Sequence, residues 1–179
     1  GGTFHIVGLF SSGSVHAYAD HMYAMLRFAK REGLERVAIH LFGDGRDSPA
    51  QELKTFLPQL EERMRTECPA AFIASIIGRH FSMDREERWD LIAEAYNCLI
   101  GKKGASFEYL KKYLEDSYAA GVTDEFFVPA WKVNEKGEFY RKVSAKTIAE
   151  KLKKSGVTAD DIALDEKSIN KPGEYSIPV

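Results

Sequence analysis

The stretches that decide the fold are VAIHLFGDGRDSP (residues 37–49) and FIASIIGRHFSMDR (residues 72–85). Each begins with a short apolar run, which is typical of a buried strand, and each continues with glycine, arginine and aspartate. Ligands of open α/β sheets usually bind beyond the carboxyl ends of the strands, where these charged residues fall. Because guanidinium groups bind carboxylate and phosphate through two hydrogen bonds, the turns predict a site for a small polyanion that carries hydroxyl groups.

The order of the predicted elements indicates an α/β fold. A third apolar run (residues 4–10) precedes the other two, and apolar residues at helical spacing follow each of the three. We therefore expect a three-layer α/β/α domain with a mainly parallel sheet. A strand at residues 126–133 and a turn leading to residues 138–143 predict a late antiparallel hairpin at the edge of the sheet. We expect one domain over residues 1–179, with a loosely ordered polar tail at residues 157–179.

Three local features carry further predictions. Pro58 should kink or divide the second helix. Asp84 and Glu87 have the spacing of a capping box for a third helix, and Ser106 is placed to cap a fourth. The third helix has apolar residues at helical spacing, which predicts that they face the core: Trp89, Ile92, Ala93, Tyr96, Leu99 and Ile100.

The composition is that of an ordinary globular protein. Of the 179 residues, 44% are hydrophobic and 29% are charged, and the net charge of −2 gives no reason to expect a nucleic-acid partner. No apolar run approaches the roughly 20 residues of a membrane-spanning helix, and no signal peptide is recognisable at the start. Cys68 and Cys98 lack metal-binding spacing, and we expect them to be reduced and buried in a cytoplasmic protein.

The first candidate binding residue is His16, which follows the small-residue loop at residues 11–15 and precedes a predicted helix. Backbone N–H groups in such a loop favour an anion. On one interpretation His16 hydrogen-bonds a substrate oxygen. On the other it caps the helix or contacts solvent.

The second and third candidates are Arg46 and Asp47, in a turn whose glycines allow close approach of the backbone. Arg46 would bind a carboxylate or phosphate, and Asp47 would accept hydrogen bonds from hydroxyl groups. The alternative is an ordinary strand-to-helix turn, in which Asp47 caps the helix and Arg46 forms a surface ion pair.

Arg79 and Arg85 complete the candidate set. They lie six residues apart across a turn, so both can reach one anion, and Arg88 follows one helical turn later. The alternative is solvated charge at the start of a helix, although basic residues there oppose the helix dipole.

Other chemistries lack their motifs. The chain has no Gly-x-Ser-x-Gly elbow, no Gly-x-Gly-x-x-Gly turn and no Walker loop. The five histidines are scattered without a His-x-x-x-His pair, so we expect no metal site in this chain.

The motifs together resemble one family. The segments GLFSSGSVHAYADHMYAMLRFAKREGLERVAIHLFGDGRDSP, IASIIGRHFSMDREERWDLIAEAY and YLEDSYAAGVTDEFFVPAWKV are similar to the cofactor-independent phosphoglycerate mutases, over residues 4–133. The resemblance implies an isomerase of glycolysis and gluconeogenesis that interconverts 3-phosphoglycerate and 2-phosphoglycerate. In that family a phosphatase-like domain carries a nucleophilic serine and two divalent metal ions, usually manganese. An inserted phosphotransferase domain holds and reorients the glycerate.

This chain resembles the inserted domain alone. By motif match its substrate-binding residues would be His16, Arg46, Asp47, Arg79 and Arg85. The resemblance implies that its partners are the phosphoglycerate substrate and the phosphatase-like domain of the parent chain. The nucleophilic serine and the metal ligands are absent, so the fragment should need no cofactor and should be inactive by itself.

The chain also departs from the family pattern. Tyr18 stands where a second histidine is usual, and His80 stands where the family has tyrosine. The later Arg-Pro-Asp-Arg motif, whose arginines bind phosphate in the family, is not found, and the similarity ends near Gly137. An organic-anion-binding or regulatory module with the same fold is therefore the alternative hypothesis. An unrelated α/β hydrolase is disfavoured by the missing nucleophile motif.

Overall fold

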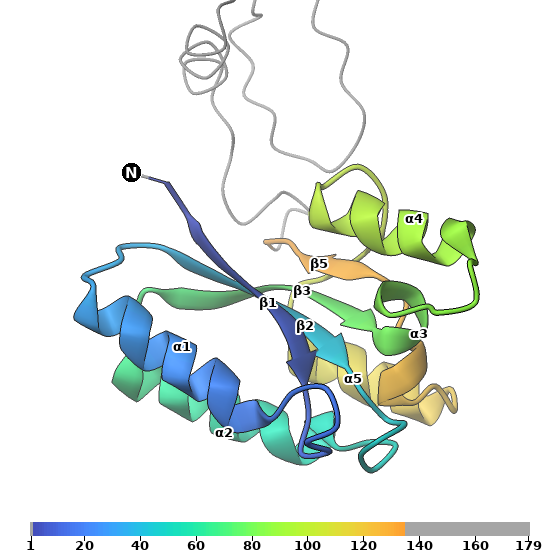
Figure 1. Cartoon of the computed structure of the whole chain (residues 1–179), viewed down its shortest axis with the longest axis horizontal. Coiled ribbons are helices and arrows are strands. Elements are labelled where there is room, and N and C mark those ends of the chain that lie inside the picture. The colour runs from blue at the N-terminus through green and yellow to red at the C-terminus, as the bar shows by residue number, and fades with distance from the viewer. Residues whose placement is uncertain (1, 135–179) are drawn as a thin grey trace, which may run out of the picture. The chain divides into compact units, whose positions relative to one another are not determined.

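The computed structural model describes residues 2–134, and Figure 1 shows how their elements are arranged. In chain order these elements are β1 (Phe4–Phe10), α1 (Ala19–Arg31), β2 (Val37–Gly43), α2 (Leu53–Glu67), β3 (Ala71–Gly78), α3 (Arg79–Ser82), α4 (Trp89–Leu99), β4 (Ala105–Phe107), α5 (Leu110–Ala119), the 3-10 helix η1 (Asp124–Phe126) and β5 (Ala130–Lys132).

The strands form one mixed sheet in the order β1-β2-β3-β5-β4. The pairs β1–β2, β2–β3 and β4–β5 are parallel, whereas β3 and β5 are antiparallel. The predicted α/β class with a mainly parallel sheet is confirmed. Because β1, β2 and β3 step across the sheet in one direction with right-handed crossovers, α1 and α2 cover the same face (Figure 1).

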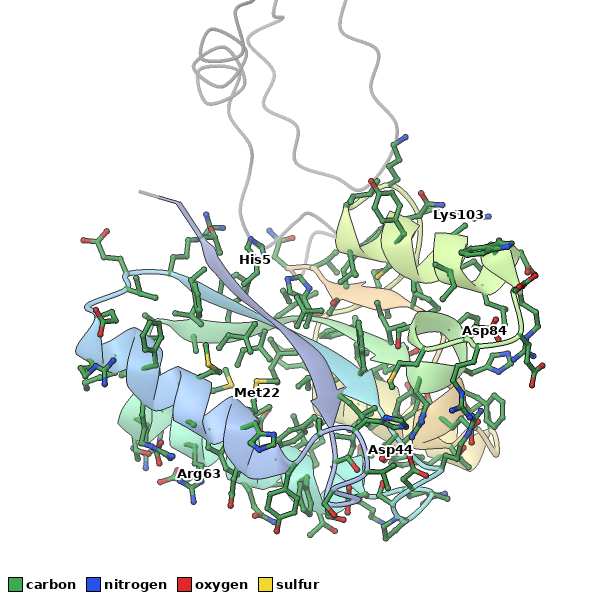
Figure 2. All side chains as sticks on the ribbon, in the orientation of Figure 1. His5, Met22, Asp44, Arg63, Asp84 and Lys103 are labelled. Carbon is green, nitrogen blue, oxygen red and sulfur yellow. The ribbon has the colours of Figure 1, made fainter. Side chains whose placement is uncertain are left out.

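The core lies between that face and its helices. The alternation of β2 directs Val37, Ile39 and Leu41 to this side, and each is fully buried. Met22 on α1 lies between the helix and the sheet, as Figure 2 shows. Burial of this apolar surface stabilises the sheet and so fixes where the three parallel strands end.

Helix α4 covers part of the opposite face, where it contacts β3 and β5. It buries Ala95 and Cys98 on its inner side. The prediction that the apolar residues beginning at Trp89 face the core is wrong for the largest of them, because Trp89 is 71% exposed, Tyr96 60% and Ile100 46%. Helix α4 is apolar on two sides, and periodicity cannot decide which of two apolar faces the sheet will cover.

Three other local predictions are also corrected. Ser106 lies in β4, and the next helix begins at Leu110. Pro58 does not divide α2, because it lies in an exposed part of the second turn, where water can reach the carbonyl that loses its partner. The antiparallel strand β5 lies inside the sheet, between β3 and β4, and the predicted second hairpin strand at residues 138–143 lies outside the described residues.

Both cysteines are free and buried, as predicted. Burial raises the pKa of the Cys98 thiol to about 12, so this side chain acts as a small apolar group in the packing of α4.

Candidate anion-binding site

The loops after β1, β2 and β3 meet at one edge of the sheet, because the three strands are parallel and in register. Asp44 lies at this edge, beyond the tips of the strand arrows in Figure 2. The close approach of the first two loops requires glycine at position 13, since a Cβ atom there would lie 2.5 Å from the carbonyl oxygen of Asp47. The sequence therefore folds the His16 loop directly against the Asp44–Asp47 turn.

Arg79 is the buried centre of this edge. Its guanidinium Nη1 donates to Asp44 Oδ1 and to Asp47 Oδ2, each at 2.6 Å. Only 4% of the Arg79 side chain and 1% of the Asp44 side chain are exposed. Burial alone would lower the pKa of Arg79, but the hydrogen bonds and negative charges of Asp47 and Asp44 have the larger effect and raise it. Arg79 thus remains charged and fixed in one orientation.

Asp44 holds the turn of residues 44–47 in place through several hydrogen bonds. It accepts a hydrogen bond from Ser11 Oγ at 2.5 Å and from the backbone N–H groups of Arg46 and Asp47. Burial would raise the pKa of the Asp44 carboxyl, but these hydrogen bonds and the one from Arg79 hold it below its usual value. Asp44 therefore carries a negative charge at neutral pH and ties the β1 loop, the β2 turn and Arg79 together.

His16 lies beside this network. Its Nε2 atom is 3.7 Å from Asp47 Oδ2, the same oxygen that Arg79 contacts. The His16 side chain is exposed and the Asp47 side chain is one-quarter exposed. The imidazole and the carboxylate can both reach a ligand hydroxyl at the surface, one as a donor and the other as an acceptor.

Arg46 is held from a distant part of the chain. Its Nε and Nη2 atoms donate to Glu125 Oε1, at 2.9 and 2.5 Å. Glu125 belongs to η1, 79 residues later in the sequence. This contact directs the guanidinium group of an otherwise exposed side chain.

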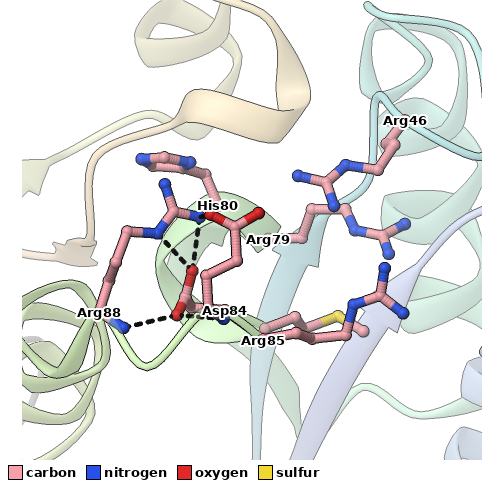
Figure 3. A pocket seen from close by; sticks show the side chains of 8 residues that line it. Arg46, Arg79, His80, Asp84, Arg85 and Arg88 are labelled. Atoms are coloured by element: carbon pink, nitrogen blue, oxygen red, sulfur yellow. Dashed lines mark hydrogen bonds and ion pairs between the residues drawn. The ribbon is translucent and has the colours of Figure 1, made fainter.

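A pocket of about 380 Å³ opens beside these residues. Its lining residues are Arg46, Arg79, His80, Met83, Asp84, Arg85, Glu86 and Arg88. Figure 3 shows the guanidinium groups of Arg46, Arg79 and Arg85 gathered on one side, with Arg88 against Asp84 on the other. Four of the lining residues are arginines and two are acidic, so the pocket offers guanidinium donors that can bind a carboxylate or phosphate.

Asp84 organises the far side of this pocket. Its carboxylate accepts hydrogen bonds from the backbone N–H groups of Glu86 and Arg88 and from the Arg88 side chain. These contacts replace the predicted capping box with Glu87, and α4 begins only at Trp89. Arg88 is thus bound by a carboxylate, whereas Arg85 lies opposite it with its guanidinium group in the pocket.

Comparison with known proteins identifies the family of the chain. The family described as BPG-independent PGAM N-terminus matches residues 1–148. The chain belongs to this family of phosphoglycerate mutases. A second family, described as ribosomal protein L9, C-terminal domain, matches residues 119–179, most of which lie outside the described structure.

Similar bacterial proteins are named 2,3-bisphosphoglycerate-independent phosphoglycerate mutase. The protein of Moorella thermoacetica is 45% identical over 130 residues, which cover 73% of this chain and 25% of the relative. The protein of Syntrophotalea carbinolica is 41% identical over 135 residues, 75% of this chain and 26% of the relative. The protein of Mycoplasmoides gallisepticum is 43% identical over 134 residues, which cover 75% of this chain and 26% of the relative.

A solved relative shares the fold. A crystal structure of Leishmania mexicana phosphoglycerate mutase at low cobalt concentration superposes with a TM-score of 0.67 and 29% identity, over 76% of this chain and 26% of that one. The chain therefore spans about a quarter of the length of the mutases it matches.

The residues predicted from the mutase motifs come together only in part at the pocket. Arg46, Arg79 and Arg85 line it, whereas His16 and Asp47 join it through the contact between Asp47 and Arg79. The structure adds two residues that were not predicted. Asp44 stood inside the motif, but its burial was not apparent, and no local signal connects Glu125 with Arg46.

Two of the departures from the mutase pattern, Tyr18 and His80, lie in different surroundings. Tyr18 immediately precedes α1 and is 42% exposed. His80 lines the pocket, and its ring packs against Phe81 and Phe126 at centroid distances of 5.1 and 5.0 Å. The change at His80 therefore bears directly on the site.

Within residues 2–134, no group of three or more histidine, cysteine, aspartate or glutamate side chains is placed to hold a metal ion. None of the helices in this part of the chain combines the length and the apolar character that a membrane crossing requires.

Proposed function

We propose that this chain is the substrate-holding part of a BPG-independent phosphoglycerate mutase, an isomerase that interconverts 3-phosphoglycerate and 2-phosphoglycerate. The observation that carries the proposal is the pocket on which Arg46, Arg79 and Arg85 gather from two neighbouring strand ends. Both phosphoglycerates have a carboxylate, a phosphate and one hydroxyl on three carbons. Such a ligand matches an arginine-lined pocket with a polar imidazole–carboxylate pair beside it.

The site residues would divide the work by their chemistry. Arg46 and Arg85, whose side chains reach the surface, would bind the anionic groups through paired hydrogen bonds. Arg79 would present a fixed positive charge from below. Asp47 and His16 would bind the glycerate hydroxyl and transfer its proton as phosphate leaves or arrives. These roles orient the substrate and so reduce the entropic part of the barrier.

The group that accepts the phosphoryl would come from the remainder of the mutase. Ser11 and Ser12 of the first loop are poor candidates, because Ser11 is completely buried against Asp44 and the Ser12 hydroxyl is hydrogen-bonded to Glu52. The resemblance to the family places a nucleophilic serine and two divalent ions, usually manganese, in a phosphatase-like domain. The described residues do not fit such a metal centre, so we assign them no metal-dependent step. A role in glycolysis would imply that the protein acts in the cytoplasm.

Calorimetric titration tests the proposal directly. The purified chain should bind 3-phosphoglycerate and 2-phosphoglycerate, and it should bind glycerol 3-phosphate, which lacks the carboxylate, more weakly. A parallel mutase assay with and without Mn²⁺ should show no turnover. Metal-dependent turnover by this chain alone would contradict the assignment. Binding of other organic anions but of neither phosphoglycerate would support the alternative, a binding module with the same fold.

A further inference from the structure

The contact between Glu125 and Arg46 uses only one edge of the guanidinium group. Nε and Nη2 are the two nitrogens of the side edge, and both donate to the single oxygen Oε1. A guanidinium group has five N–H donors in a rigid plane. The edge formed by Nη1 and the second hydrogen of Nη2 is geometrically available for a carboxylate or phosphate while Glu125 remains bound.

Glu125 is itself held rigidly, since η1 is anchored on both sides of it. On one side the Asp124 carboxylate accepts hydrogen bonds from the backbone N–H of Leu53, at the start of α2, and from the Tyr118 hydroxyl. On the other side Gly78 donates its backbone N–H to the carbonyl of Phe127 at 2.7 Å. The backbone of Glu125 thus has a defined position, from which its carboxylate reaches Arg46.

The packing of η1 on the strand ends requires glycine at two positions, because a side chain at either would collide with the backbone of Glu125. A Cβ atom at Gly78 would lie 2.3 Å from the carbonyl oxygen of Glu125, and one at Gly45 would lie 2.8 Å from its backbone nitrogen. The backbone of Glu125 therefore packs between the turn that carries Arg46 and the strand that leads to Arg79. Its neighbour Phe126 contacts the ring of His80 in the pocket.

We propose that Glu125 is the positioning residue of the anion site: it holds Arg46 by the side edge and presents the end edge to the ligand. This inference rests on the proposed function, because the ligand is the phosphoglycerate of that pocket. An exposed arginine side chain loses conformational freedom when it binds an anion. Glu125 removes part of that freedom beforehand and so favours binding, although its own negative charge opposes the ligand's.

The test separates orientation from charge by comparing two variants. E125A removes the contact and should weaken 3-phosphoglycerate binding about tenfold, the effect of one charge-assisted hydrogen bond. E125Q removes the charge but keeps an acceptor oxygen, so its affinity should stay within about threefold of the wild type. The matched control is E62A, because Glu62 also binds an arginine, Arg65, through two hydrogen bonds, on α2 away from the pocket.

A double-variant cycle shows whether Glu125 acts through Arg46. In an R46A background, E125A should cause no further loss of affinity. Tighter binding by E125A would mean that charge repulsion outweighs orientation, and an equal loss in the R46A background would mean a general structural effect. Either result would overturn the inference.

A second measurement needs no ligand. The Arg46 Nε–H proton should exchange slowly with solvent in the wild type and rapidly in E125A, as followed by ¹⁵N NMR of the full chain. Equal exchange rates would refute the positioning role. A wild-type chain that shows slow exchange but binds no phosphoglycerate would retain the contact and refute the proposed function, so the two failures are distinguishable.

Discussion

Replacing Arg79 with methionine should lower the free energy of unfolding by about 3–5 kcal/mol, the usual effect of removing one partner of a buried ion pair. The magnitude follows from burial: Arg79 is 4% exposed, and its partner Asp44 is 1% exposed. Without Arg79 the Asp44 carboxylate keeps its hydrogen bond from Ser11 but loses its countercharge. Chemical denaturation at neutral pH, followed by far-ultraviolet circular dichroism, measures the loss.

The effect of R79M on stability should also depend on pH. In the wild type the pKa of Asp44 is lowered from 3.8, so its contribution to stability is present above that value and is lost as the pH falls through the folded-state pKa. In R79M the same carboxyl loses the charge that favours ionisation. The stability difference between wild type and R79M should therefore shrink as the pH falls below about 4, and the double variant D44N/R79M should recover most of the loss at neutral pH.

Two outcomes would refute this reasoning. A loss below about 1 kcal/mol would show that the pair is hydrated rather than buried. A double variant as unstable as R79M would show that the loss arises from packing around the arginine stem and not from an uncompensated carboxylate.

Three further predictions concern the rest of the site. R46A and R85A should each weaken 3-phosphoglycerate binding about tenfold while changing the free energy of unfolding by less than about 0.5 kcal/mol, because both side chains are exposed; calorimetry and denaturation together check this. G13A should lower the free energy of unfolding by about 1–3 kcal/mol, because its Cβ would meet the Asp47 carbonyl oxygen; an unchanged denaturation midpoint would contradict that contact. Burial raises the pKa of the Asp124 carboxyl from 3.8 to about 6, so the stability that this group contributes is full below pH 3.8 and is lost as the pH rises through 6. Relative to D124N, the free energy of unfolding of the wild type should fall by about 3 kcal/mol over this interval. Parallel pH profiles of the two proteins would refute this prediction.

The sequence predicts the part of the fold that short-range patterns determine. The apolar runs correspond to β1, β2 and β3, and their parallel order follows from the intervening helices. Parallel strands place their carboxyl ends together, which is why the sequence alone predicts that Arg46 and Arg79 lie at one edge of the sheet.

What the sequence does not predict depends on contacts between distant residues. Strand β4 has three residues and no periodicity of its own, and it pairs with β5 some 25 positions later. The outward stripe of α4 could not be recognised, because the choice between two apolar faces depends on where the sheet lies. The partner of Arg46 is 79 residues away, in a 3-10 helix without a motif.

The functional residues divide in the same way. Motif spacing predicts that Arg46, Arg79 and Arg85 bind an anion, because guanidinium chemistry is local to each side chain. Their different situations are a property of the fold: Arg79 is buried between two carboxylates, Arg46 is held by Glu125, and Arg85 lies exposed at the pocket.

The most direct test of the account is the NMR response of the arginine side chains to 3-phosphoglycerate. On titration of the full chain, the Nε–H signals of Arg46, Arg79 and Arg85 should shift with one common dissociation constant. The signal of Arg65, which pairs with Glu62 on α2, should not move. Unmoved pocket signals, or an equal response of Arg65, would contradict the claim that this pocket holds the phosphoglycerate.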